Sequence, residues 1–117
     1  MTANRTQTQR PRRFQISRRG TLDDGNRRFA CLIQDISEKG LLLICNHDLE
    51  VGSELAVQFE LGVGAGFSGR IRIRHFRDGC CGAELVAADH ESGRNWNLFL
   101  ESNYSGQLAA AERRRRL

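Results

Sequence analysis

The sequence lacks any long apolar segment. No apolar run in its 117 residues approaches the roughly 20 residues that a membrane-spanning helix needs. The polar N-terminal stretch also lacks the apolar core of a secretory signal peptide. These two absences predict a cytoplasmic protein that does not insert into a membrane.

Motifs that carry catalysis or bind metals are missing as well. There is no Gly-x-Ser-x-Gly nucleophile motif and no glycine-rich phosphate loop. The histidines show no metal-ligand spacing, and the adjacent Cys80 and Cys81 would point to opposite faces of a strand. No two cysteines form a Cys-x-x-Cys pair, which favours reduced thiols. We therefore expect neither an enzyme nor a metal site, and no cofactor.

Basic charge is abundant, but it lies at the two ends of the chain. Residues 1–28 contain eight arginines against two aspartates, and residues 113–116 are all arginine. Residues 29–111 between them carry eleven acidic and six basic side chains. The net charge of +4 therefore does not describe the central region. Binding of specific nucleic acids by the folded surface is not expected.

Short β-strand patterns fill most of the chain. Apolar runs or apolar–polar alternation mark residues 14–22, 28–34, 41–45, 54–61, 70–76 and 80–87. In the fifth of these segments, alternation places Ile71, Ile73 and His75 on one face. Asp78-Gly79 predicts a tight hairpin to the last strand. Six short strands with tight turns predict a mainly all-β fold, a small antiparallel barrel.

The spacing of apolar residues changes to that of a helix after Asp89. Asp89 or Ser92 is suited to cap the N-terminus of this helix, and Tyr104-Ser105-Gly106 is expected to end it. The predicted fold is thus a six-stranded antiparallel β-barrel with a C-terminal α-helix. The expected divisions are a flexible lead-in over residues 1–9, a barrel domain over 10–102, and an extension with a basic tail over 103–117.

One segment stands out between the second and third predicted strands. Asp35, Ser37 and Gly40 form Asp-x-Ser-x-x-Gly, which we expect to be a tight turn. In a structural interpretation, the aspartate and serine bond their own backbone while Gly40 adopts a positive φ. In a functional one, the carboxylate and hydroxyl contact a ligand whose approach the glycine permits. A rigid turn serves both roles.

Arg10, Arg12 and Arg13 lie just before the first predicted strand. Guanidinium groups bind phosphates and the N7/O6 edge of guanine in bidentate fashion. The arginines and the turn together predict an anionic, guanine-containing ligand. The alternative is a solvated basic lead-in that binds nothing specific. His75 and Arg77, at the end of the fifth strand, are further candidates for stacking on a guanine.

This combination resembles the signature of PilZ domains, the bacterial receptors for cyclic di-GMP. The Asp-x-Ser-x-x-Gly half matches fully, whereas the arginine half is usually Arg-x-x-x-Arg and here reads Arg10-Pro11-Arg12-Arg13. Residues three apart in an extended chain point to opposite faces, so Arg10 and Arg13 converge only if the chain bends between them. Pro11 favours such a bend. The resemblance covers roughly residues 10 to 102.

The resemblance implies that cyclic di-GMP contacts the arginines and the turn. The residues implied are Arg10, Arg12, Arg13, Asp35, Ser37 and Gly40. It also implies that the ligand orders the arginine segment and that the domain signals through an unidentified protein partner, with outputs in motility, pilus function or exopolysaccharide synthesis. Two alternatives stay open: a PilZ-like adaptor that does not bind cyclic di-GMP, and a small basic barrel that binds single-stranded nucleic acid.

Overall fold

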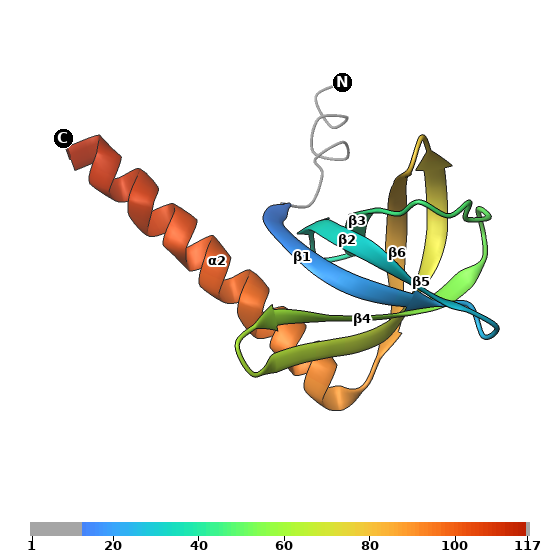
Figure 1. Ribbon diagram of the computed structural model, residues 1–117. Coiled ribbons are helices and arrows are strands. Elements are labelled where there is room, and N and C mark those ends of the chain that lie inside the picture. Colours follow the sequence, from blue (N-terminus) through green and yellow to red (C-terminus); the bar gives the residue numbers. More distant parts are fainter. Residues whose placement is uncertain (1–12, 117) are drawn as a thin grey trace, which may run out of the picture.

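The computed structural model describes the backbone of residues 13–116 and the side chains of residues 13–103. Its strands are β1 (Phe14–Asp23), β2 (Arg28–Ile36), β3 (Gly40–Ile44), β4 (Glu54–Gly62), β5 (Ala65–Arg77) and β6 (Cys80–Ala88). They pair antiparallel throughout and close in the order β1-β2-β3-β6-β5-β4 (Figure 1). One helix, α2 (His90–Arg116), follows the barrel. The predicted six-stranded barrel with a C-terminal helix is confirmed.

The core fills the inside of the barrel, as expected where alternate side chains of each strand point inward. Strand β4 contributes four buried side chains at every second position: Leu55, Val57, Phe59 and Leu61. The apolar run at the start of β3 also alternates in the structure, because Leu41 and Leu43 are buried whereas Leu42 is only half-buried. The period of two, rather than the apolar content alone, decides which side chains enter the core.

Strand β5 departs from the predicted alternation near its end. Ile71 and Ile73 are buried, but the pairing with β6 shifts register between Ile73 and His75. A bulge adds one residue to a strand and sends the following side chains to the opposite faces. The prediction that His75 shares a face with the isoleucines is therefore wrong: His75 is exposed, and Phe76 packs against the core.

The β5–β6 hairpin confirms the prediction made from Asp78-Gly79. Asp78 has a φ of 51° and Gly79 a φ of 83°. Positive φ at both central residues is the geometry of the type I′ turn, which matches the twist of the flanking strands. This hairpin positions the C-terminal end of β5 against the start of β6.

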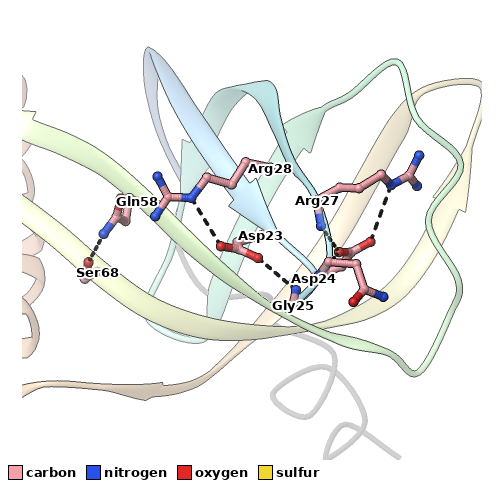
Figure 2. Close-up of polar contacts among 8 residues, drawn as sticks. Asp23, Asp24, Gly25, Arg27, Arg28, Gln58 and Ser68 are labelled. Atoms are coloured by element: carbon pink, nitrogen blue, oxygen red, sulfur yellow. Dashed lines mark hydrogen bonds and ion pairs between the residues drawn. The ribbon is translucent and has the colours of Figure 1, made fainter.

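The β1–β2 hairpin is held by aspartates that bond the backbone of their own turn (Figure 2). Asp23 accepts a hydrogen bond of 2.8 Å from the backbone N–H of Gly25, and Asp24 accepts one of 2.7 Å from Arg27. The guanidinium of Arg28 lies 3.2 Å from Asp23. The backbone N–H donors keep the pKa values of both carboxyl groups below their usual range, because they favour the charged form.

Helix α2 begins at a capped end that is tied to the barrel. Asp89 accepts a hydrogen bond of 2.8 Å from the backbone N–H of Ser92, which confirms Asp89 as the capping residue. The Ser92 hydroxyl accepts a second bond of 2.9 Å from the backbone of Ser68 in β5. One turn further on, Trp96 is buried with its ring centroid 4.8 Å from that of Phe67. The start of the helix is therefore anchored over β5.

The predicted end of the helix at Tyr104-Ser105-Gly106 is wrong. Helix α2 continues through these residues to Arg116, and its second half extends away from the barrel (Figure 1). A single glycine costs about 1 kcal/mol in a helix interior, and the Leu108–Glu112 segment that follows is rich in strong helix formers. Across residues 13–116, no helix combines the length and apolar composition required to cross a membrane.

All four cysteines are free thiols in different environments. Cys31, Cys45 and Cys81 are buried in the core, whereas Cys80 is exposed on the outer face of β6. Burial raises the pKa of Cys31 to about 12 and the pKa of Cys81 to about 11, because desolvation disfavours the thiolate. The thiols of Cys31 and Cys81 therefore stay protonated at neutral pH.

We expect one of the four thiols to react rapidly in the native protein. An aromatic disulfide reagent at neutral pH should modify Cys80 quickly and the other three only after denaturation, because Cys80 is exposed and the other three are buried. Released thiophenolate, followed by absorbance, counts the reacting groups. Cys80→Ser should abolish the fast phase. Two or more fast-reacting equivalents in the folded protein would contradict the burial described above.

Candidate functional site

The Asp-x-Ser-x-x-Gly segment forms a shorter turn than predicted. Asp35 belongs to β2 and Gly40 begins β3, so only Ser37-Glu38-Lys39 connects the two strands. The backbone N–H of Ser37 donates to the Gly40 carbonyl at 2.8 Å, and the Ser37 hydroxyl accepts from the Lys39 N–H at 3.4 Å. Ser37 is 9% exposed. The serine therefore makes the turn rigid, as in the structural interpretation.

Gly40 is required for a different reason from the one predicted. Gly40 is not among the residues with positive φ, so the expectation of a left-handed conformation is wrong. A Cβ added at Gly40 would overlap the backbone carbonyl of Ala83 and lie 3.1 Å from the Cα of Glu84. The glycine therefore lets β6 approach the start of β3 closely. The physical need is space, not conformational freedom.

Arg13 and Asp35 meet in an ion pair. The guanidinium Nη1 of Arg13 donates to Oδ1 of Asp35 at 3.3 Å. The pairing of Gln15 with Asp35 at the start of β1 brings Arg13 beside this carboxylate. The Asp35 side chain is 13% exposed and that of Arg13 is 51% exposed. A largely buried carboxylate thus holds a guanidinium that still faces solvent.

A hollow of about 430 Å³ lies beside this pair. It is bounded by the turn, the end of β5 and the middle of β6, and its lining residues are Arg13, Ser37, Lys39, Gly40, Leu41, Arg74, His75, Gly82, Ala83 and Glu84. Three of these side chains are cationic and one is a carboxylate. We call it the turn hollow. Its excess of positive charge suits an anionic ligand.

The sequence of this chain matches a known protein family. The family model described as the PilZ domain matches residues 4–100. This chain belongs to the PilZ domain family. PilZ domains are regulatory binding domains for cyclic di-GMP rather than enzymes.

A solved structure supports the same fold. The PilZ domain described here matches the Bacillus subtilis inhibitor of motility, MotI/DgrA, with a TM-score of 0.64 at 13% sequence identity. The match covers 87% of this chain and 52% of that one, so this chain spans about half the length of the motility inhibitor. At this identity the likeness concerns the fold alone. A search of curated proteins finds no match.

The PilZ fold brings together some of the predicted site residues and not others. Arg13, Ser37, Gly40 and His75 line the turn hollow, and Asp35 holds Arg13 at its edge. Arg77 does not line the hollow: its side chain is 91% exposed and lies 3.9 Å from Asp78. Arg10 and Arg12 fall outside the described residues. Their part in the site stays a prediction.

His75 lies on the outer face of the barrel, over Gly82. The two residues pair across β5 and β6, and a Cβ at Gly82 would overlap the imidazole ring. The missing side chain at Gly82 therefore makes room for the ring at the wall of the hollow. The β5 bulge makes this placement possible, because without it His75 would face the core.

Lys39 and Glu84 line the hollow but were not identified from the sequence. Lys39 occupies an unspecified position of the PilZ turn motif, so the motif draws no attention to it. Glu84 lies 44 residues after Gly40 and enters the site because it pairs with Gly40 across β3 and β6. No local signal in the sequence could indicate that pairing.

Two other hollows share the lining residues Thr21, Gln58 and Ser68. The larger, of about 800 Å³, contains three carboxylates, of Glu60, Asp89 and Glu91, against two arginines. The smaller, of about 300 Å³, includes polar groups that already bond one another (Figure 2). The turn hollow is therefore the most cationic of the three. Within the described residues, no three His, Cys, Asp or Glu side chains cluster as metal ligands.

Proposed function

We propose that this PilZ domain binds cyclic di-GMP in the turn hollow and signals the bound state to a protein partner without catalysing a reaction. The observation that carries the proposal is the Arg13–Asp35 pair at the edge of a cationic hollow. The pair joins the two halves of the sequence motif in space. Family membership supports the identity of the ligand.

The cations of the hollow suit the two phosphodiesters of cyclic di-GMP. Arg13, Lys39 and Arg74 lie on different walls, and each is available to a phosphate oxygen. Hydrogen bonds between charged partners contribute about 1.5–3 kcal/mol each. Asp35 presents Arg13 toward the ligand, and the exposed ring of His75 offers a face for a guanine to stack on.

The proposed mechanism is ordering of the N-terminal arginine segment around the ligand, with Arg10 and Arg12 adding contacts to those of Arg13. Fixing the backbone of a residue costs about 1–2 kcal/mol, so several arginine contacts are needed for net affinity. In this proposal residues 10–102 form the functional unit in the cytoplasm and residues 103–117 an extension. In this proposal Arg77 contacts the ligand only if its guanidinium moves away from the Asp78 carboxylate, with which it forms an ion pair.

The cellular process that we propose for this domain to regulate is one of those usual for PilZ domains. The solved neighbour is an inhibitor of motility. We propose motility or exopolysaccharide regulation through a partner that contacts the ligand-ordered surface. The ordered surface offers a direct physical link, because a partner that binds only the ordered state is recruited only when ligand is present.

Calorimetric titration of the full chain with cyclic di-GMP tests the proposal. We expect saturable heat that reports an affinity in the range of cellular ligand concentrations. No heat with tens of micromolar protein would refute the receptor proposal. It would favour the second candidate, a PilZ-like adaptor that does not bind cyclic di-GMP, which the Arg-x-x-Arg spacing of Arg10 and Arg13 supports.

Single-stranded nucleic acid is less well supported as a ligand. Base stacking needs exposed aromatic rings, and the exposed large apolar side chains of the described residues are aliphatic: Val51, Val63, Val86 and Leu98. Strongly salt-dependent binding of arbitrary oligonucleotides, unaffected by cyclic di-GMP, would be needed to favour it.

A further inference from the structure

A row of alternating charges crosses the outer face of the barrel and ends in the turn hollow. Its five side chains come from β4, β5 and β6, in the order Arg70, Glu54, Arg72, Glu84 and Arg74. Of these five, Glu84 and Arg74 line the hollow. Arg74 stands at the end of the row, and Glu84 is its one acidic partner among the described residues. The arginine of β5 that faces the hollow is therefore already paired.

The contact between Arg74 and Glu84 is looser than the others in the row. Arg72 Nη2 donates to Glu54 Oε2 at 2.7 Å, whereas Glu84 Oε1 lies 3.6 Å from Arg72 Nη1 and 3.7 Å from Arg74 Nη1. The two longer distances exceed those of charge-assisted hydrogen bonds. Glu84 Oε1 is nevertheless closed off from solvent and accepts no hydrogen bond from the described residues. Two guanidinium groups thus shield this oxygen without bonding it, which is unfavourable for a charged acceptor.

We infer that Glu84 is an internal counter-ion, which a phosphate of the ligand displaces from Arg74, and that Glu84 thereby limits the affinity of the turn hollow for anions. The inference rests on the proposed function. A phosphate oxygen accepts charge-assisted hydrogen bonds from a guanidinium, which Glu84 Oε1 does not do here. The side chain of Arg74 is 61% exposed, so its guanidinium is free to turn toward the hollow. Glu84 keeps Arg72 as its cation, and its Oε1 atom becomes open to water.

The charge of Glu84 also acts on the ligand directly. Glu84 lines the hollow with a side chain that is 44% exposed, and its backbone pairing with Gly40 fixes its strand beside the turn motif. Like charges in one site repel, and both phosphodiesters of cyclic di-GMP are negative. This repulsion needs no contact between the ligand and the shielded oxygen. Removing the charge of Glu84 therefore frees Arg74 and relieves a repulsion, and both changes favour binding.

Glu84→Gln should bind cyclic di-GMP about threefold or more tightly than the wild-type protein, which is the size expected for an exposed ion pair together with the repulsion. Calorimetry of the full chain at constant ionic strength measures the gain. The same substitution made in Arg74→Ala should give less than about a twofold gain, because only the screened repulsion then remains. An equal gain in both backgrounds would overturn the displacement of Glu84 from Arg74.

Glu60→Gln is the matched control. Glu60 is an exposed carboxylate on β4 and does not line the turn hollow, yet its substitution changes the net charge by the same amount. We expect its affinity to stay close to that of the wild type. Unfolding by urea checks that each variant is folded. Glu84→Thr, which also removes the charge and places a residue suited to a strand, provides a second variant if Glu84→Gln is not folded.

The outcomes separate this inference from the proposed function. If neither the wild-type protein nor Glu84→Gln binds cyclic di-GMP, the proposed function fails and the role of Glu84 falls with it. If the wild type binds and Glu84→Gln binds equally or more weakly, only the counter-ion role is overturned. Equal gains in Glu84→Gln and Glu60→Gln would indicate net charge and would overturn it as well. Tighter binding that depends on Arg74 supports it.

Discussion

Arg13→Ala and Asp35→Ala should each weaken cyclic di-GMP binding about tenfold or more. In the proposed site, Arg13 supplies charge-assisted hydrogen bonds of about 1.5–3 kcal/mol to a phosphate, and 1.4 kcal/mol corresponds to a tenfold change in affinity. Asp35 acts through Arg13: its carboxylate lies 3.3 Å from the guanidinium and is mostly shielded from solvent. Without it, the arginine must be ordered at the moment of binding. Calorimetry at constant ionic strength measures both losses.

Arg94→Ala is the control for net charge. Arg94 is exposed on α2 and does not line the turn hollow, yet its removal changes the charge of the protein by the same amount as Arg13→Ala. We expect its affinity to stay close to that of the wild type. Equal losses in Arg13→Ala and Arg94→Ala would indicate attraction by bulk charge and would argue against a specific site. Arg13→Lys should be intermediate, because lysine keeps the charge but not the bidentate fork.

Gly40→Ala should destabilise the fold by roughly 3 kcal/mol, at the upper end of the usual cost of overpacking. The added methyl group would overlap the Ala83 carbonyl, which is backbone and cannot rotate away. Relief requires β3 and β6 to separate, which breaks the pairing that closes this side of the barrel. Urea unfolding monitored by circular dichroism measures the change in the free energy of unfolding.

Gly93→Ala is a matched glycine substitution with the opposite expected sign. Gly93 lies in the first turns of α2, and a Cβ there meets no atom within 4 Å. Alanine is favoured over glycine in a helix by about 1 kcal/mol, so this variant should be as stable as the wild type or more so. A Gly40→Ala protein with wild-type stability would show that β3 and β6 do not approach as closely as described.

The fold was largely predictable because its signals are local. Alternation along β4, the Asp78-Gly79 hairpin and the Asp89 cap depend on residues next to one another in the chain, and each is confirmed. The turn motif was also visible, since its residues are within six positions. The sequence alone was therefore sufficient for the barrel, the helix start and the family resemblance.

The chemistry of the turn hollow depended on contacts between distant segments. A bulge set by pairing with β6 moves His75 to the outer face, and Gly40 is needed because β6 passes close to it. Glu84 joins the turn only through the β3–β6 register. Sequence determines the period and the turns of each strand, because these follow from neighbouring residues. Only the closed barrel decides which strands lie together, and so which charges line the turn hollow.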